Sequence, residues 1–211
     1  MTVQTLRARL TRDDIQRLSS ATDSEGRALA ARKFCARFAS VDLSDDERAI
    51  GAEVVRLLAE DAAEMVRRSL SVTLQRSTHL PPDVARKLAK DMDSIALPVI
   101  AGSPVLSDDD LVEIVRTSSA RRQAAVAARS SVSESVVHEL VELGDREAVK
   151  ILASNNGARF DERGYASALN RFDGDADVLD QFVLRNALPV NITEKLIAHI
   201  SDEAMQKLVN R

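Results

Sequence analysis

The sequence has few of the residues that form disulfides or metal sites. A single cysteine, Cys35, excludes an intramolecular disulfide and any metal site built from a cysteine cluster. The three histidines, His79, His138 and His199, share no spacing typical of metal ligands. We therefore expect neither a structural metal nor a cofactor.

Glycine and aromatic residues are also scarce. The 211 residues include seven Gly, five Phe, one Tyr and no Trp, a composition that favours helices over strands. No apolar run approaches the roughly 20 residues that cross a bilayer, so we expect no membrane span. The first residues, MTVQTLRARLTRDD, carry charges early and lack the apolar stretch of a secretory signal. These features predict a cytoplasmic protein.

The charge is balanced except towards the C-terminus. The formal net charge is -4, and residues 131–211 hold nine basic against fourteen acidic side chains. Nonspecific binding of nucleic acid depends on a dense basic stripe that neutralises phosphates, and no such stripe is present at this level. We therefore do not expect a nucleic acid partner.

An internal repeat is the strongest signal in the sequence. Residues 80–89 and 188–197 share Leu, Pro, Lys and Leu at the same offsets. Weaker copies start at Leu106, Val132 and Phe160, which gives steps of 26, 26, 28 and 28 residues. A period in this range is typical of stacked structural repeats.

Four positions of the ten-residue copy predict a helix and its orientation. The second holds residues that favour a helix N-terminus, namely Pro81, Ser107, Ser133, Asp161 and Pro189. The eighth is polar and predicted to face water, as Lys87, Glu113, Glu139, Ser167 and Lys195. The ninth and tenth are apolar in every copy and predict a buried seam of Leu88 and Ala89, Ile114 and Val115, Leu140 and Val141, Ala168 and Leu169, and Leu196 and Ile197.

A second helical segment precedes each copy, so each repeat is predicted to be a helix pair. These upstream helices are expected at residues 62–76, 93–102, 118–129, 145–154 and 175–186. One pair cannot bury its apolar seam alone, and stacking of the pairs covers it. The expected fold is therefore an all-α superhelix, a solenoid of about five helix pairs of 26–28 residues.

The N-terminal portion departs from this period and is predicted to form a helical cap, residues 1–60, on a continuous solenoid domain, residues 61–211. Residues 13–20 are expected to form a short helix and residues 24–40 a longer one. The inward residues of the longer helix are expected to be Leu29, Ala30, Phe34 and Phe38. A further helix is predicted from Leu43 to about Glu60, with a buried face of Ile50, Val54, Leu57 and Leu58.

Three segments carry a resemblance to a known family. They are LSDDERAIGAEVVRLLAEDAAEMVRRSL from Leu43, LPPDVARKLAKD from Leu80 and PVLSDDDLVEIV from Pro104. With them, about residues 40–200 resemble the bacterial family called domain of unknown function 2336 (DUF2336). The resemblance implies helical repeats of the HEAT and armadillo type. It implies no activity and no ligand-binding residue.

The candidate catalytic groups have structural interpretations. The carboxylate clusters at Asp45–Glu47 and Asp108–Asp110 precede helical segments, where they stabilise the positive end of a helix. The acidic loop at Asp173–Asp177 lacks the glycine and glutamate positions of a calcium loop. Cys35 lies on an apolar helix face and is interpreted as a small buried hydrophobe. We therefore predict that the protein is not an enzyme.

The leading functional hypothesis is a scaffold or adaptor that binds a protein or peptide along a groove. By analogy with related repeat folds, the second helices would line it. Its candidate residues run from basic to acidic and are Lys87, Lys90, Glu113, Arg116, Glu139 and Glu142. One alternative is a nucleic-acid-binding HEAT-like module. Another is a homo-oligomeric adaptor that associates through the N-terminal helix bearing Phe34 and Phe38.

Overall fold

The chain folds into two compact units that contain only helices in the part that the structure describes. In this computed structural model the described residues are 18, 23–40, 43–186, 188–197 and 200–209. Met1–Ser107 is called here the N-terminal unit, and Asp108–Arg211 the C-terminal unit. Across the described ranges no strand occurs, and an isolated parallel bridge joins Val132 to Ala158. The prediction of an all-α fold is confirmed.

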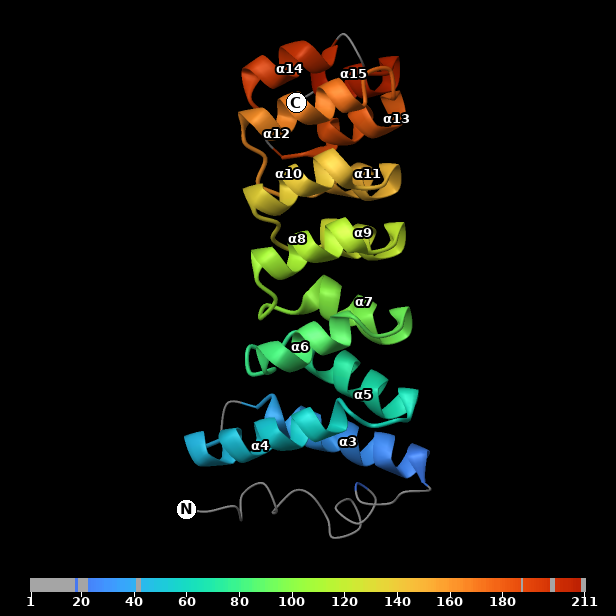
Figure 1. Ribbon diagram of the computed structural model, residues 1–211. Coiled ribbons are helices and arrows are strands. Elements are labelled where there is room, and N and C mark those ends of the chain that lie inside the picture. The colour runs from blue at the N-terminus through green and yellow to red at the C-terminus, as the bar shows by residue number, and fades with distance from the viewer. Residues whose placement is uncertain (1–17, 19–22, 41–42, 187, 198–199, 210–211) are drawn as a thin grey trace. The chain divides into compact units, whose positions relative to one another are not determined.

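Within the N-terminal unit, helices pack in succession. They are α3 (Ser24–Phe38), α4 (Asp45–Leu58), α5 (Glu64–Leu74), α6 (Pro82–Ala89) and α7 (Asp93–Gly102). Helix α5 packs against α3 and α7, α4 packs against α3 and α5, and α6 packs against α7 (Figure 1). The first helices α5 and α7 and the second helix α6 of the predicted repeats are therefore all present at the expected positions.

The contact between α5 and α7 combines apolar packing with a side-chain hydrogen bond. Leu70, Leu74 and Ile95 are fully buried there, and the Ser71 hydroxyl donates a hydrogen bond of 2.5 Å to the Ile95 carbonyl. Removing these aliphatic side chains from water stabilises the unit by roughly 1.5–3 kcal/mol for each side chain. The buried Ser71 hydroxyl therefore has a hydrogen-bond partner, and no donor of this side chain is left unpaired in the core.

Helix α4 begins as predicted but buries a different face. Its first turn is closed by a capping box in which the Glu47 amide donates to the Ser44 hydroxyl, and Glu47 Oε2 accepts from the Ser44 amide. The buried residues are Glu47, Gly51, Val55 and Leu58. Of the predicted face only Leu58 is buried, so that prediction was wrong.

Gly51 explains this difference in register. A Cβ at Gly51 would lie 2.6 Å from Cδ2 of Phe38, so only glycine lets α4 approach α3 this closely. Phe34 and Phe38 are buried as predicted. The aliphatic residues Ile50 and Leu57 instead face solvent, with exposed fractions of 47% and 72%. Leu29 of α3 was also expected inside and is 47% exposed.

Some predictions are not tested by the described residues. Nearly all of the short helix expected at residues 13–20 lies outside them. The domain boundary predicted at residue 60 and the continuous domain predicted for residues 61–211 stay predictions.

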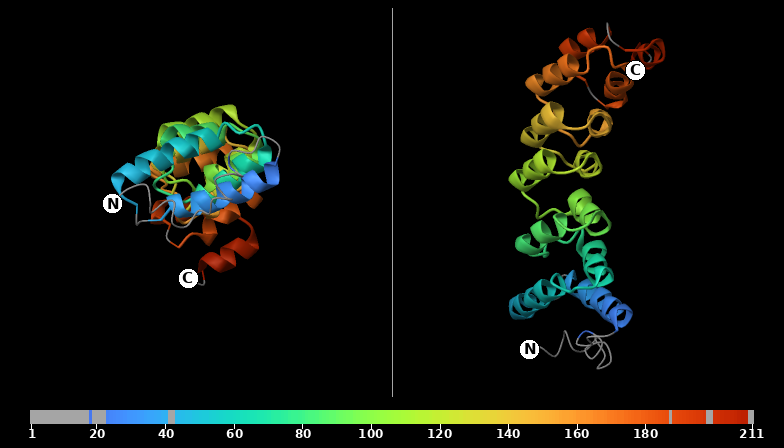
Figure 2. Two further views of the ribbon diagram at one scale, coloured as in Figure 1. Left: turned by 90° about the horizontal axis from the view of Figure 1, so that it is seen from below. Right: turned by 45° about the vertical axis from the view of Figure 1, so that its right-hand side comes forward.

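The C-terminal unit consists of two rows of helices. Its elements are α8 (Asp108–Thr117), α9 (Ala120–Ala127), α10 (Glu134–Leu143), α11 (Arg146–Ser154), α12 (Glu162–Arg171), α13 (Ala176–Leu179), the 3-10 helix η1 (Asp180–Leu184), α14 (Val190–Ile197) and α15 (Asp202–Val209). One row follows α8, α10, α12 and α14, and the other follows α9, α11, α13 with η1, and α15 (Figures 1 and 2). Within this unit the packing is consistent with a helical superhelix.

The predicted seam is buried except near its C-terminal end. Leu88 and Ala89 of the N-terminal unit are buried, as are the seam residues of α8 and α10 and Ala168 and Leu196. Leu169 is only partly buried, and Ile197 is 46% exposed, so these two predictions were wrong. Helix α14 contacts α12 through its buried face of Ile192 and Leu196, which directs Ile197 away from the seam.

Long polar side chains tie each helix pair of the C-terminal unit to the pair before it. Arg171 donates to the carbonyls of Val141 and Gly144 at 2.6 and 2.8 Å, at the end of α10. Asn155 donates to the carbonyls of Ala127 and Arg129 at 2.7 and 2.8 Å, at the end of α9. The last carbonyls of a helix have no partner within it, so the next repeat supplies one.

The seam predicts a specific loss of stability. Leu140→Ala on α10 should lower the free energy of unfolding by about 2–5 kcal/mol, because it leaves a cavity in a fully packed site. Urea unfolding followed by circular dichroism measures this change. Leu143→Ala on the same helix is the control, since Leu143 is 55% exposed. Equal effects of the two substitutions would contradict the seam.

Candidate binding site between α12 and α14

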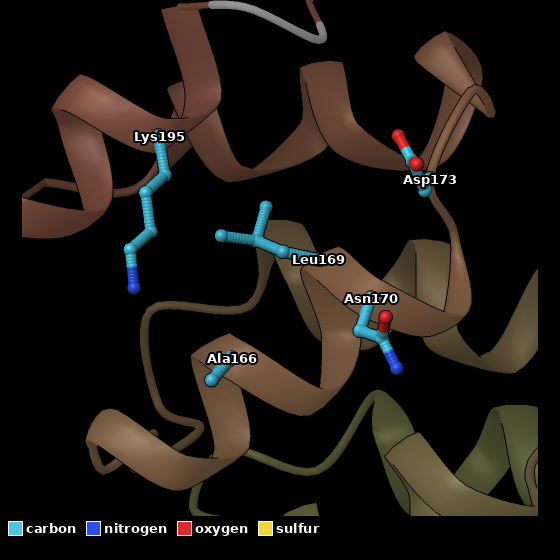
Figure 3. Close-up of a pocket in the computed structure, with 5 residues that line it drawn as sticks. All are labelled: Ala166, Leu169, Asn170, Asp173 and Lys195. Carbon is cyan, nitrogen blue, oxygen red and sulfur yellow. The ribbon is translucent and has the colours of Figure 1, made fainter.

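A pocket of about 270 Å³ opens between α12 and α14 of the C-terminal unit (Figure 3). Ala166, Leu169 and Asn170 of α12 line it, together with Lys195 of α14 and Asp173 of the turn after α12. In the view of Figure 3 the Leu169 side chain lies between Lys195 on one side and Asp173 on the other. The site therefore combines an apolar floor with a cation, a carboxylate and an amide.

The N-terminus of α12 is held by a shared carboxylate oxygen. Asp161 is its N-cap, and Asp161 Oδ1 accepts from the Gly164 amide at 2.7 Å. The same oxygen lies 2.7 Å from Nε2 of His138, on α10. A Cβ at Gly164 would lie 3.1 Å from Oδ1 of Asp161, a tight contact, and 3.4 Å from Cδ2 of His138. His138 therefore links α10 to α12.

A long-range cap fixes the other end of α12, and a proline precedes α14. The two carbonyl contacts of Arg171 hold the last turn of α12 against the end of α10. Pro189 precedes α14, and its carbonyl accepts from the Thr193 amide at 2.9 Å, the first helical hydrogen bond. The proline has no amide of its own to leave unsatisfied at this helix start. Both walls of the pocket are thus positioned by backbone and capping interactions.

The pocket lies at repeat positions that the sequence selected in other copies. Lys195 occupies the eighth position of its copy, as do Lys87, Glu113 and Glu139 in theirs. Asn170 occupies the eleventh position, one past the copy, as do Lys90, Arg116 and Glu142. The six predicted groove residues are therefore the counterparts of Asn170 and Lys195. The prediction selected the same two repeat positions, but in other copies.

The same positions are closed by an ion pair between α8 and α10. Arg116 Nε donates to Glu139 Oε1 at 2.6 Å, and Arg116 Nη2 donates to Glu139 Oε2 at 2.8 Å. Between α12 and α14 the corresponding residues are Asn170 and Lys195, which have no carboxylate between them. Because they cannot form an ion pair, this part of the surface stays open. The absence of an acid at these two positions is the signal that could have located the pocket.

The six predicted groove residues fall in both units. Lys87 forms an ion pair with Glu60, and Lys90 is exposed in the same N-terminal unit. In the C-terminal unit Arg116 forms an ion pair with Glu139. Glu142 lies 3.5 Å from Arg163, and Glu113 is exposed. Much of the charge predicted to face a partner is therefore neutralised within the chain.

Hydrogen bonds shift the ionisation of the groups around this face. The bond to Glu139 raises the pKa of the Arg116 guanidinium above its usual range. The hydrogen bond with His138, which has the larger effect, and the bond from the Gly164 amide both lower the pKa of Asp161. Both shifts favour the charged forms, so these links between helices persist at neutral pH.

Cys35 is buried, and the acidic loop at Asp173–Asp177 is paired with a cation. Burial raises the pKa of Cys35 to about 12, so its thiol is protonated at neutral pH. Arg146 donates to both Asp175 oxygens and to Asp177, so a guanidinium neutralises the acidic loop. In the described part of the chain no group of three or more His, Cys, Asp or Glu side chains is placed to hold a metal ion. His199 lies outside the described residues.

Comparison with known proteins assigns a family to the chain. Residues 95–211 match the family described as "Uncharacterised protein conserved in bacteria (DUF2336)". The chain belongs to the DUF2336 family. The DUF2336 match includes the whole pocket and the PVLSDDDLVEIV segment, whereas the segments that start at Leu43 and Leu80 lie upstream of it. No curated protein and no solved structure matches the chain. Among the described helices, none has the length and apolar character needed to span a bilayer.

The Asp161 contacts predict a pH-dependent loss of stability. The pKa of Asp161 is lowered in the folded state, so its contribution is present above about pH 4 and is lost as the pH falls through the folded-state value. Asp161→Asn keeps a capping side chain but removes the charge. It should lower the thermal unfolding midpoint at pH 7, and the difference from the wild type should shrink towards pH 2.

Glu134→Gln is the matched control for this measurement. Glu134 is an exposed carboxylate in the first turn of α10. Scanning calorimetry across the pH series should show little change for this variant. A difference for Asp161→Asn that stayed constant from pH 7 to pH 2 would contradict the assignment.

Proposed function

We propose that this DUF2336 protein is a non-catalytic HEAT-like scaffold in the cytoplasm that binds a segment of a partner protein. The binding surface is the face of α8, α10, α12 and α14 that carries the eighth and eleventh repeat positions. The observation that carries the proposal is the pocket at Asn170 and Lys195, open where Arg116 and Glu139 close the equivalent position. A repeat surface of this kind presents an extended face to a ligand.

The chemistry of the pocket supports binding rather than catalysis. The Asn170 amide both donates and accepts hydrogen bonds, which matches a peptide backbone. Leu169 and Ala166 offer an apolar floor for a side chain, and Lys195 and Asp173 place opposite charges around it. A catalytic site would need a nucleophile or base oriented by a neighbouring group, and no such pair lines the pocket.

The arginines argue against the nucleic acid alternative. Four arginines each donate to a carboxylate of this chain through two guanidinium nitrogens. They are Arg56, Arg67, Arg116 and Arg146. A guanidinium that is already paired must give up its carboxylate before it can contact a phosphate. A salt titration with a labelled DNA duplex tests this alternative, since phosphate contacts produce a steep fall in affinity with salt.

The proposal predicts a localised loss of partner capture. Lys195→Glu should reduce recovery of the partner from a lysate by about tenfold, because it reverses the charge at the edge of the pocket. Quantitative mass spectrometry of proteins retained on the immobilised chain measures this. Arg76→Glu, a reversal of an exposed cation in the N-terminal unit, is the control and should have no effect.

A third variant locates the binding surface. Lys87→Glu with Lys90→Glu alters the counterparts of the pocket residues in the N-terminal unit. Loss of capture in this variant alone would move the binding surface there. Unchanged capture in every variant would reject the face defined by the eighth and eleventh positions.

Self-association is a second candidate, and one observation favours it. Ile50 and Leu57 are 47% and 72% exposed on the same side of α4, spaced two helical turns apart. Phe34 and Phe38, on the helix that the sequence suggested for such a contact, are buried within the chain. We therefore propose α4 as the interface in place of that helix.

Leu57→Asp tests this second candidate. If α4 joins two copies, the variant should shift the mass measured by light scattering from dimer to monomer, because a carboxylate would then be buried in the interface. Measurement at two concentrations distinguishes a weak dimer from a monomer. A wild-type chain that is monomeric at both would remove self-association from consideration.

A further inference from the structure

We propose that the pocket between α12 and α14 recognises a glutamate side chain of a partner peptide, with Lys195 as its counter-ion and Asn170 as its backbone contact. This inference rests on the proposed function and names the ligand chemistry of the same site. Four observations lead to it, and each concerns residues of the C-terminal unit.

The first observation is a carboxylate that one repeat contains and another lacks. Glu139 supplies the acid that pairs with Arg116 across α8 and α10. Across α12 and α14 the same two positions hold Asn170 and Lys195, a neutral side chain and a cation. A partner that brings a carboxylate to Lys195 completes the pairing that the chain makes by itself between α8 and α10.

The second observation is that Lys195 is available. Its side chain is exposed, and among the described residues no hydrogen bond or ion pair engages its ammonium group. Asp173, the carboxylate that also lines the pocket, takes part in another interaction. In Figure 3 it lies beyond Leu169 as seen from Lys195. The positive charge of Lys195 is therefore open to a ligand.

The third observation is the shape and size of the site. Its volume of about 270 Å³ lies below the roughly 300–1,000 Å³ of typical small-molecule sites, so it suits one side chain of a longer ligand. Leu169 and Ala166 form an apolar floor beside Lys195, which suits the methylene groups of glutamate. With one cation and Asp173 nearby, the pocket favours a singly charged carboxylate over a doubly charged phosphate.

The fourth observation concerns Asn170. It is exposed, and no hydrogen bond of its amide is found within the described part of the chain. Its carbonyl and NH₂ groups can accept from and donate to the backbone next to the bound glutamate. Such a contact does not depend on the side chains of the peptide, but it fixes the direction in which the peptide crosses α12.

The test begins with a phage-displayed library of random seven-residue peptides selected on the immobilised full chain. The enriched peptides should contain a glutamate at one consistent position. Synthetic, labelled versions are then titrated by fluorescence anisotropy. Both Lys195→Gln in the protein and Glu→Gln in the peptide should weaken binding by about fivefold, the size expected for a partly exposed ion pair. The two changes together should weaken it no further than either alone.

A double variant controls for the fold. Asn170→Arg with Lys195→Glu rebuilds the pair of Arg116 and Glu139 and should close the pocket, which abolishes binding while leaving the thermal unfolding midpoint at or above that of the wild type. Arg76→Glu should bind as the wild type does. A peptide with Lys in place of Glu should bind Lys195→Glu better than it binds the wild type.

Each outcome decides between the two proposals. Enriched peptides without an acidic residue, or with affinity unchanged by Lys195→Gln, overturn the glutamate assignment but leave peptide binding by the scaffold intact. A library that yields no enriched peptide overturns both. Enriched peptides whose binding survives in the double variant place the site elsewhere on the chain and overturn the inference alone.

Discussion

The fold depends on an aliphatic seam that no helix pair can cover alone. Helix α10 shows this most clearly, because Leu140 and Val141 are fully buried and α10 packs against both α8 and α12. A single pair would leave these side chains in water, so its own hydrophobic gain would not offset the entropy of ordering it. Stability in each unit therefore arises between repeats, and the residues at those contacts control whether a given surface is closed or open.

Polar side chains make the same contacts specific. Aliphatic packing alone tolerates small shifts of one helix along another, whereas Arg171 and Asn155 each reach two carbonyls of the preceding pair and accept few alternative positions. Arg185 does the same at Asn155 and Ala158, at 2.6 Å to each carbonyl. These ties explain how α12 is held firmly at both ends although its seam residue Leu169 is only partly buried.

The repeat period predicted most of the fold, because it depends on local signals. The helix starts at Ser133 and Asp161 and the seam at Leu140 follow directly from capping and apolar spacing. The buried face of α4 could not be predicted in this way, since it depends on Gly51 meeting Phe38, a contact between residues 13 positions apart with no periodic signature. The long-range caps were missed for the same reason: a basic residue on a helix gives no indication of which distant carbonyl it will reach.

The pocket lies where the repeat departs from the pairing that joins α8 to α10. Helix α8 places an arginine at its eleventh position and α10 a glutamate at its eighth, and the two form an ion pair. This pairing neutralises both charges within the chain, although the Arg116 side chain stays 58% exposed. At the corresponding positions of α12 and α14, Asn170 and Lys195 have no side-chain partner among the described residues. In a fold whose repeats satisfy one another, a ligand is expected where two neighbours fail to do so.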